Sequence, residues 1–271
     1  MTIIFLITCI FEKKMSTKRR DDKKKSYVSI KMVIIASIFD GLKKLFLILK
    51  QYFMITILNK SNSLFNTFLA ETRDERIQRD SYRFRRNMER MGSVFAYEIS
   101  KQMEFRVHEV PTPFGTAEEQ IISQPPVILS VLRAGLPVHQ GVLNFFDSAS
   151  GGFISMRRDN DKNGKFNVSL EYISCPSIND KEVILCDAMI ASGTSMTLAY
   201  QSLLAKGVPK HVHLIAVIAS KEGLESLRKK LPKKGVSLWL GALDDELTAK
   251  SYIVPGIGDA GDLAYGAKDT E

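Results

Sequence analysis

The sequence predicts an α/β fold in which a mostly parallel β-sheet is flanked by helices. From residue 54 onward, short runs of apolar and β-branched residues alternate with segments of helical hydrophobic spacing. This alternation is typical of a parallel sheet, because each connection between parallel strands crosses back over the sheet, usually as a helix. Residues 54–271 contain no internal repeat and no Pro-rich linker, so we expect them to form one domain.

The first expected element is a long amphipathic helix. Its apolar residues advance by 4, 3, 4, 4 and 4 positions, which keeps them on one helical face: Phe84, Met88, Met91, Phe95, Ile99 and Met103. We expect this face to pack in the core.

Six strands follow, because runs rich in Val and Ile favour extended structure: residues 127–131, 153–156, 168–173, 183–186, 212–219 and 236–240. Helical spacing predicts three helices among them, at residues 136–146, 195–206 and 221–231. Residues 159–165 join two of the strands through Asn163-Gly164, a dipeptide that favours a tight hairpin turn.

The formal net charge of +8 arises outside this expected domain. Of the 38 Lys and Arg residues and the 30 Asp and Glu residues, twelve and four lie in residues 1–53, which leaves 26 of each sign in residues 54–271. A neutral domain offers no overall basic surface for nucleic acid. The composition, 45% apolar and 25% charged, excludes collagen-like, disulfide-scaffold and wholly disordered proteins.

Cysteine usage indicates a reducing compartment. Cys9, Cys175 and Cys186 lie far apart in the sequence, with neither a CxxC pair nor zinc-ligand spacing. A disulfide framework and a zinc site are therefore not expected, and we expect a cytoplasmic protein.

Residues 1–53 differ in kind from the rest. Their apolar runs, residues 3–11, 32–39 and 45–49, are each shorter than the ~20 residues that span a membrane, and charged residues separate them. The first run lacks a preceding basic stretch and a following small-residue cleavage site, which argues against a secretory signal. Two interpretations stay open: a basic amphipathic helix on a membrane surface, or an extension that contributes nothing.

The segment Val183–Thr197, VILCDAMIASGTSMT, carries the clearest chemistry. An apolar strand leads to Asp187 at its end, and a loop of small residues turns directly into a helix. Such a turn directs main-chain N–H groups, hydroxyls and a helix N-terminus at one point, where they bind phosphate. The carboxylate of Asp187 accepts hydrogen bonds and so suits a pair of sugar hydroxyls. Neither GxxxxGK[ST] nor GxGxxG occurs here, which argues against NTPases and dehydrogenases.

This segment resembles the phosphoribosyl pyrophosphate signature of the type I phosphoribosyltransferases. Two further segments, SVLRAGLP at residues 130–137 and YIVPGIGDAGD at residues 252–262, are similar to those of the uracil phosphoribosyltransferase family. The resemblance extends from about Asn59 to Gly266. It implies the conversion of uracil and phosphoribosyl pyrophosphate to UMP and pyrophosphate, with Mg²⁺ held mainly by the substrate's pyrophosphate and not by protein side chains.

The resemblance also implies roles for individual residues. Asp187 would hold the ribose hydroxyls, and Arg133 with Arg158 would face the leaving pyrophosphate, because a guanidinium binds phosphate oxygens in pairs. Arg133 and Asp187 are the expected catalytic residues. The loop residues expected to bind the sugar phosphate, the last five of them around the 5′-phosphate, are Ala188, Met189, Ile190, Ala191, Ser192, Gly193, Thr194 and Ser195.

For the base, the resemblance implies readout by main-chain groups of Ile253, Gly258 and Ala260. Asp259 would lie against the phosphoribosyl substrate beside the base. Glycines in this segment let the chain approach a flat ring closely. The family also implies a homo-oligomer, leaves activation by GTP open, and gives no role to nucleic acid or a membrane.

Three features leave alternatives open. Ala188 stands where the family has Pro, which suits the start of a loop equally well. Thr194 stands where the family has Gly, so either the loop avoids positive φ there or substrate affinity is altered. Residues 159–165 are either a solvated turn or, in the family interpretation, the tip of a mobile hairpin that closes over substrate.

Two rivals to a pyrimidine-salvage enzyme follow from the same residues. One is a regulator of the same fold that senses uridine nucleotides and binds RNA; the other is a membrane-tethered enzyme that depends on residues 1–53. The neutral charge of residues 54–271 and the complete uracil segment favour the salvage enzyme. Because the stretch from Met54 looks like the start of relatives, we expect translation to begin there.

Overall fold

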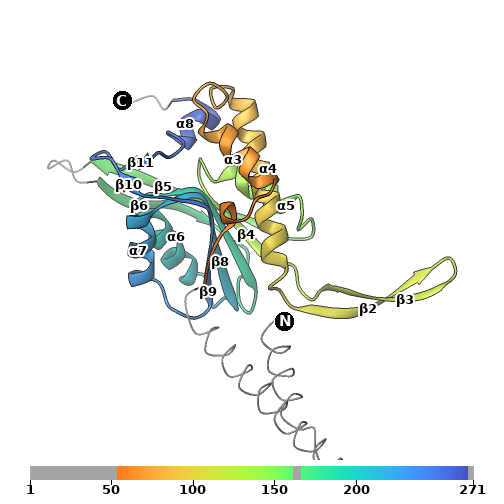
Figure 1. Ribbon diagram of the computed structural model, residues 1–271. Coiled ribbons are helices and arrows are strands. Elements are labelled where there is room, and N and C mark those ends of the chain that lie inside the picture. Colours follow the sequence, from red (N-terminus) through yellow and green to blue (C-terminus); the bar gives the residue numbers. More distant parts are fainter. Residues whose placement is uncertain (1–53, 161–165, 268–271) are drawn as a thin grey trace, which may run out of the picture. The chain divides into compact units, whose positions relative to one another are not determined.

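The computed structural model describes residues 54–160 and 166–267. Their centre is a seven-stranded sheet with the strand order β1-β9-β8-β7-β4-β5-β6 (Figure 1). Its strands are β1 (Met54–Ile57), β4 (Val127–Val131), β5 (Ser150–Asn160), β6 (Phe166–Ser174), β7 (Glu182–Ile190), β8 (His211–Ser220) and β9 (Val236–Asp244). Neighbouring strands are parallel except for β5 and β6, which are antiparallel. The expected mostly parallel sheet is confirmed.

Helices cover both faces of this sheet, as Figure 1 shows. On one face, α3 (Leu64–Arg73), α4 (Ser81–Ser100) and α5 (Leu136–Leu143) share an apolar cluster with Ile184 and Ile215. On the other face, α6 (Thr194–Leu204) and α7 (Lys221–Lys230) share a cluster with Leu185 and Leu214. Successive residues of one strand thus serve opposite cores, which explains why these strands are continuous apolar runs.

The predicted amphipathic helix is confirmed as α4, with shifted ends. It begins at Ser81 because the carboxylate of Asp80 accepts hydrogen bonds from the N–H groups of Tyr82 and Arg83, at 3.0 and 3.1 Å. It ends at Ser100, so Met103 lies beyond the helix although its side chain is buried.

Strand β7 extends further than the sequence predicts. We expected it to end at residue 186, but pairing with β8 continues from Asp187↔Ala216 to Ile190↔Ala219. Asp187 therefore lies within the strand and not at its end. The cause is the length of β8, a buried apolar strand whose main-chain groups need partners up to Ser220.

Several elements were missed because they carry little periodic signal. The hairpin of β2 (Phe105–Thr112) and β3 (Gly115–Ile122) stands away from the sheet in Figure 1 and is largely exposed along both strands, so its residues do not alternate. The other missed elements are β1 and the short η1 (Leu58–Lys60), β10 (Glu246–Leu247), β11 (Ile253–Val254) and α8 (Ala260–Tyr265). Helix α3 was also missed, although its buried residues Phe65, Leu69 and Thr72 have helical spacing.

Some predictions concern residues outside the described ranges. The pairing of β5 with β6 continues to Asn160↔Phe166, but the Asn163-Gly164 turn lies outside the described residues, as do residues 1–53. In residues 54–160 and 166–267, no helix is long and apolar enough to cross a membrane.

Candidate active site

The turn after β7 is built around a left-handed glycine. Ala191, Ser192 and Gly193 separate β7 from Thr194, the first residue of α6. Gly193 has a φ of 77°, and the hydroxyl of Thr197 donates to its carbonyl at 2.7 Å. The positive φ falls on Gly193 and not on Thr194, so the turn avoids the conformation that a β-branched residue resists.

The start of α7 supports this turn from behind. The hydroxyl of Ser220 donates to the Ala191 carbonyl at 2.6 Å and accepts the Gly223 N–H at 2.8 Å, which caps α7. A Cβ atom on Gly223 would lie 2.2 Å from the same carbonyl, so this close approach requires glycine. The turn is therefore held before any ligand arrives.

Asp187 and the loop that carries Arg133 are neighbours. The side chain of Asp187 is buried, and its Oδ1 accepts the N–H of Ala188 at 2.7 Å. In the β4–α5 loop, a Cβ atom on Gly135 would lie 2.5 Å from the Cys186 carbonyl and 3.1 Å from the Cα of Asp187. Because β4 and β7 are parallel neighbours, both segments lie at the carboxyl edge of the sheet, where ligands bind in such folds.

Arg133 connects this edge to the C-terminal segment. Its Nη2 donates to Oδ1 of Asp262 at 3.0 Å, and its Nη1 donates to the carbonyl of Gly266 at 3.4 Å. The peptide bond that precedes Arg133 is cis. Within the described part of the chain, the Nε of Arg133 is buried without a hydrogen-bond partner.

The segment from Ile253 to Asp262 follows a sharply turned path. The Val254-Pro255 bond is cis, and Gly256 and Gly258 have φ values of 63° and 76°. Asp259 then caps α8, because its Oδ1 accepts the N–H groups of Gly261 and Asp262 at 2.9 and 3.0 Å. Gly258 and Asp259 are exposed, so both are accessible to a ligand.

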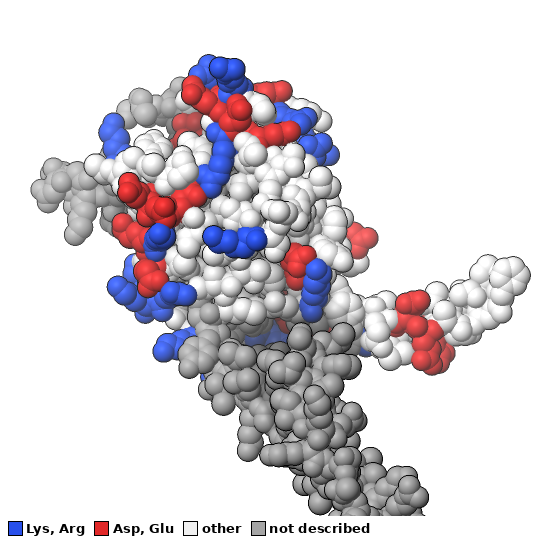
Figure 2. All heavy atoms as spheres, in the orientation of Figure 1, with Lys and Arg blue, Asp and Glu red and all other residues white. Residues whose placement is uncertain are grey.

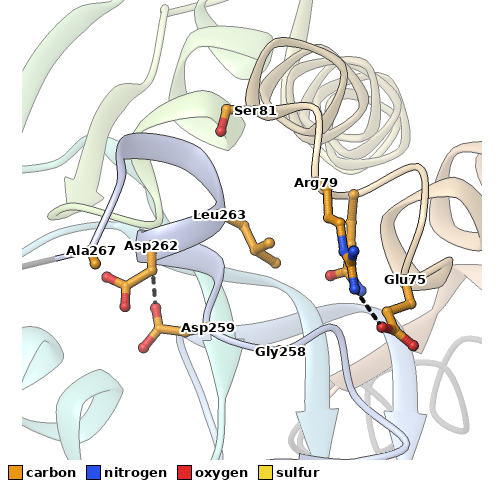
Figure 3. Close-up of a pocket in the computed structure, with 9 residues that line it drawn as sticks. Glu75, Arg79, Ser81, Gly258, Asp259, Asp262, Leu263 and Ala267 are labelled. Atoms are coloured by element: carbon orange, nitrogen blue, oxygen red, sulfur yellow. Dashed lines mark hydrogen bonds and ion pairs between the residues drawn. The ribbon is translucent and has the colours of Figure 1, made fainter.

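A pocket of about 500 Å³ lies beside this segment (Figure 3). The connection between α3 and α4 forms one wall, where Arg79 pairs with Glu75 at 2.7 Å. Figure 3 shows Asp259 and Asp262 on the other side. Of the predicted site residues, the pocket contains Gly258 and Asp259, and the remaining lining residues are Gln78, Ser81, Leu263 and Ala267.

The predicted site residues are only partly brought together. The structure brings the Arg133 loop against Asp187 and connects Arg133 to the C-terminal segment, and the turn before α6 begins four residues after Asp187 in the chain. The main chain of Arg158 lies on β5 opposite Val168, and its side chain is outside what is described. Burial raises the pKa of the Cys186 thiol, so this neighbour of Asp187 is an unreactive core residue.

Sequence reasoning missed an ion pair beside the site. Arg73, the last residue of α3, binds Asp244, the last residue of β9, through Nη1–Oδ2 and Nη2–Oδ1 contacts of 2.8 and 2.7 Å. The two residues are 171 positions apart, so no local pattern relates them. The signal in the sequence that could have revealed Asp244 is a carboxylate at the end of a buried strand.

A buried aspartate, a small-residue turn into a helix and an arginine loop, all at the carboxyl edge of a parallel sheet, define a type I phosphoribosyltransferase. The family model for uracil phosphoribosyltransferase matches residues 59–267. The chain therefore belongs to the uracil phosphoribosyltransferase family, as the sequence predicted, and is an enzyme of the phosphoribosyl transfer class.

Individual relatives agree with this assignment. The chain is 47% identical over 211 residues to a uracil phosphoribosyltransferase from Porphyromonas gingivalis. The aligned region covers 78% of this chain and 97% of the relative. One from Methanothermobacter thermautotrophicus is 36% identical over 189 residues, 69% of this chain and 85% of the relative. Among solved structures, the AQ2163 protein from Aquifex aeolicus superposes with a TM-score of 0.71 at 27% identity, over 80% of this chain and 100% of that chain.

Proposed function

We propose that this enzyme joins uracil to the phosphoribosyl group at the carboxyl edge of the sheet, as a step of pyrimidine salvage. The observation that carries the proposal is the contact between Arg133 and Asp262, 3.0 Å long, which links the sugar-phosphate edge to the segment expected to read the base. The first half-site, for the sugar phosphate, and the second half-site, for the base, are thereby adjacent. A reaction between two bound substrates requires this.

The sugar substrate is bound by the first half-site. Asp187 holds the ribose hydroxyls as an acceptor, and the residues from Ala191 to Ser195 hold the 5′-phosphate at the N-terminus of α6. Arg133 and Arg158 face the pyrophosphate. The buried Nε of Arg133, without a partner among the described residues, supports this role.

Charge determines the mechanism. As the bond between the ribose C1 and the pyrophosphate oxygen breaks, positive charge grows on the sugar and negative charge on the leaving group. The uracil nitrogen then bonds to C1, and the proton that it loses leaves with the pyrophosphate. Arg133 stabilises the departing pyrophosphate, a contribution typically worth roughly 3 kcal/mol for one well-placed donor.

Uracil is read by the main chain of the second half-site. Gly258 supplies an exposed main-chain group, and those of Ile253 and Ala260 are assigned from the resemblance, although both residues are buried. Asp259 lies against the phosphoribosyl substrate. The exposed Gly258, with its φ of 76°, supports close approach of a flat ring.

Mg²⁺ enters with the substrate in this proposal. Among residues 54–160 and 166–267, no group of three or more His, Cys, Asp and Glu side chains is placed to hold a metal ion. No step of the proposed mechanism is assigned to a protein-bound ion.

Assembly, regulation and location are proposed from the family resemblance. A homo-oligomer is supported by the β2–β3 hairpin, which exposes the apolar side chains of Phe105, Val107 and Phe114. Activation by GTP rests on the resemblance alone, and adding GTP to the assay tests it. A cytoplasmic location is supported by Cys175 and Cys186, which are free thiols.

The domain boundary also stays a prediction. Residues 54–271 form the proposed enzyme domain, and we expect the intact mass of the natural protein to correspond to a start at Met54. Detection in the native source of peptides from Lys18 to Lys50 would contradict this start.

The function is tested by pyrophosphate release from phosphoribosyl pyrophosphate, with uracil, cytosine, hypoxanthine and orotate as separate acceptors. We expect release with uracil alone, together with UMP in equal amount. Equal release without any acceptor would indicate simple hydrolysis, and release with hypoxanthine or orotate instead would assign another base.

A further inference from the structure

The Arg73–Asp244 ion pair holds one end of the segment expected to read uracil. Besides its two bonds to Asp244, the guanidinium of Arg73 donates from Nη1 to the carbonyl of Gly256 at 2.9 Å. Oδ2 of Asp244 in turn accepts the N–H of Gly256, also at 2.9 Å. One ion pair therefore binds both main-chain polar groups of a single glycine.

The backbone conformation and the packing at position 256 require glycine. Its φ is 63°, and a Cβ atom on it would lie 2.1 Å from the carbonyl of Ile253, so the chain turns back tightly on itself. Gly256 is buried, whereas Gly258 and Asp259, two and three residues further on, are exposed. The exposed groups extend from a turn whose anchor is the ion pair.

A second arginine holds the other end of the same segment. Arg85 of α4 donates from Nη1 to the carbonyl of Ala264, in α8, at 2.6 Å. Its guanidinium carbon also lies 6.0 Å from the ring centroid of Tyr265. The residues from Gly256 to Ala264 are thus tethered at both ends to the helices α3 and α4.

We infer that Arg73 and Asp244 are positioning residues of the uracil site, with Arg85 as the second tether; this inference rests on the proposed role of residues 253–260. Neither side chain of the ion pair is assigned a contact with substrate. The ion pair fixes the position and orientation of the Gly258 and Ala260 main chain, and recognition of a flat base depends on both. Misplacement of groups that position a substrate by about 1 Å reduces activity strongly.

Two conservative substitutions test this inference. Arg73→Lys keeps the charge but cannot bind Asp244 and Gly256 with a planar fork. Asp244→Asn keeps the shape but removes the negative charge and replaces one carboxylate oxygen with an amide donor, so it cannot form both bonds to the Arg73 guanidinium. We expect each to raise the KM for uracil at least fivefold while the KM for phosphoribosyl pyrophosphate changes less than twofold.

The matched control is Arg83→Lys. Arg83 forms the same kind of forked pair, with Glu71 at 2.8 and 2.7 Å, but bonds no residue of the segment. We expect both KM values to stay within twofold of the parent. Thermal unfolding of every variant shows whether lost stability accompanies the change.

The outcomes distinguish a failure of the positioning role from a failure of the proposed function. Equal rises in both KM values, or unchanged KM values with a lower unfolding temperature, would overturn the positioning role and leave the proposed function intact. Failure of the parent chain to use uracil would refute the proposed function instead. Hydrogen exchange of the ligand-free protein gives an independent check: Arg73→Lys should accelerate exchange at residues 253–264 and not in the turn before α6, and equal exchange would refute the anchor itself.

Discussion

Gly193 is the residue on which the turn before α6, proposed to bind phosphate, depends. Its φ of 77° suits glycine, and a Cβ atom would lie 3.0 Å from the Gly223 carbonyl. Thr194, the departure from the family pattern, begins α6 with ordinary negative φ. Of the two alternatives drawn from the sequence, the loop thus takes the first and keeps its strain on a glycine.

Arg133 offers the most direct residue-level test of the mechanism. We expect Arg133→Ala to lower turnover at saturating substrates by at least tenfold, because the leaving pyrophosphate loses a charged donor. The measurement is steady-state turnover, with circular dichroism to establish that the fold is retained.

Arg228→Ala is the control for this substitution. Arg228 is an exposed arginine of α7 paired with Glu225, and its loss should leave turnover unchanged. Equal turnover of Arg133→Ala and the parent at saturating substrate would remove Arg133 from the mechanism.

The helices α4 and α5 cross at a contact that two glycines make possible. A Cβ atom on Gly92 of α4 would lie 2.3 Å from the carbonyl of Val138, and one on Gly141 of α5 would lie 1.9 Å from the carbonyl of Glu89. The hydroxyl of Ser93 also donates to the Gly141 carbonyl, at 2.9 Å. Because the Arg133 loop leads into α5, this crossing determines where that loop ends.

Gly141→Ala should therefore destabilise the protein more than an ordinary surface change. We expect the free energy of unfolding to fall by about 1–3 kcal/mol, the usual cost of forcing extra atoms into a packed contact. Urea denaturation measures it. In the control, Gly151→Ala, the new Cβ would lie 3.6 Å from the nearest atom, an ordinary contact. Equal stability of the two variants would show that the crossing can relax.

The predictability of each element follows its burial. β4, β7, β8 and β9 were found from sequence because both of their faces are buried, so every residue contributes to one apolar run. The β2–β3 hairpin was missed because neither face is covered. The turn before α6 and the Arg133 loop were recognised as motifs, whereas the Arg73–Asp244 anchor joins distant residues by a contact that only the tertiary fold creates.

The charge of the whole molecule is unevenly distributed along the chain. The net +8 belongs to residues 1–53, and residues 54–271 balance 26 positive against 26 negative side chains. Figure 2 shows the two signs interspersed over the visible face of the described residues, with no broad positive surface. In the proposed function, anionic substrates are therefore bound by local groups, chiefly Arg133 and the start of α6.

The pH dependence of global stability has an identifiable contributor in His139. Its side chain is buried, and burial lowers its pKa below the ordinary value of 6.5, although a 3.3 Å contact with the Ile128 carbonyl opposes this. Below about pH 6.5 the unfolded chain binds a proton more readily than the folded chain. Stability should therefore fall as pH decreases from about 6.5 toward the lowered pKa of the folded state.

Comparing the slopes of stability against pH tests this assignment. We expect His139→Gln to show a shallower loss of unfolding free energy between about pH 6.5 and 5 than the parent, whatever its absolute stability. The control substitution is His108→Gln, on the exposed strand β2. A parental slope in His139→Gln would assign the effect to other groups.

Hydrogen exchange with and without saturating UMP tests most directly whether the enzyme acts where the two half-sites meet. UMP carries both the base and the 5′-phosphate, so a joint site predicts slower exchange at residues 187–197 and at residues 253–262, with no change in β2 and β3. Protection confined to residues 74–81 of the pocket in Figure 3, or to just one of the two segments, would contradict the proposed site.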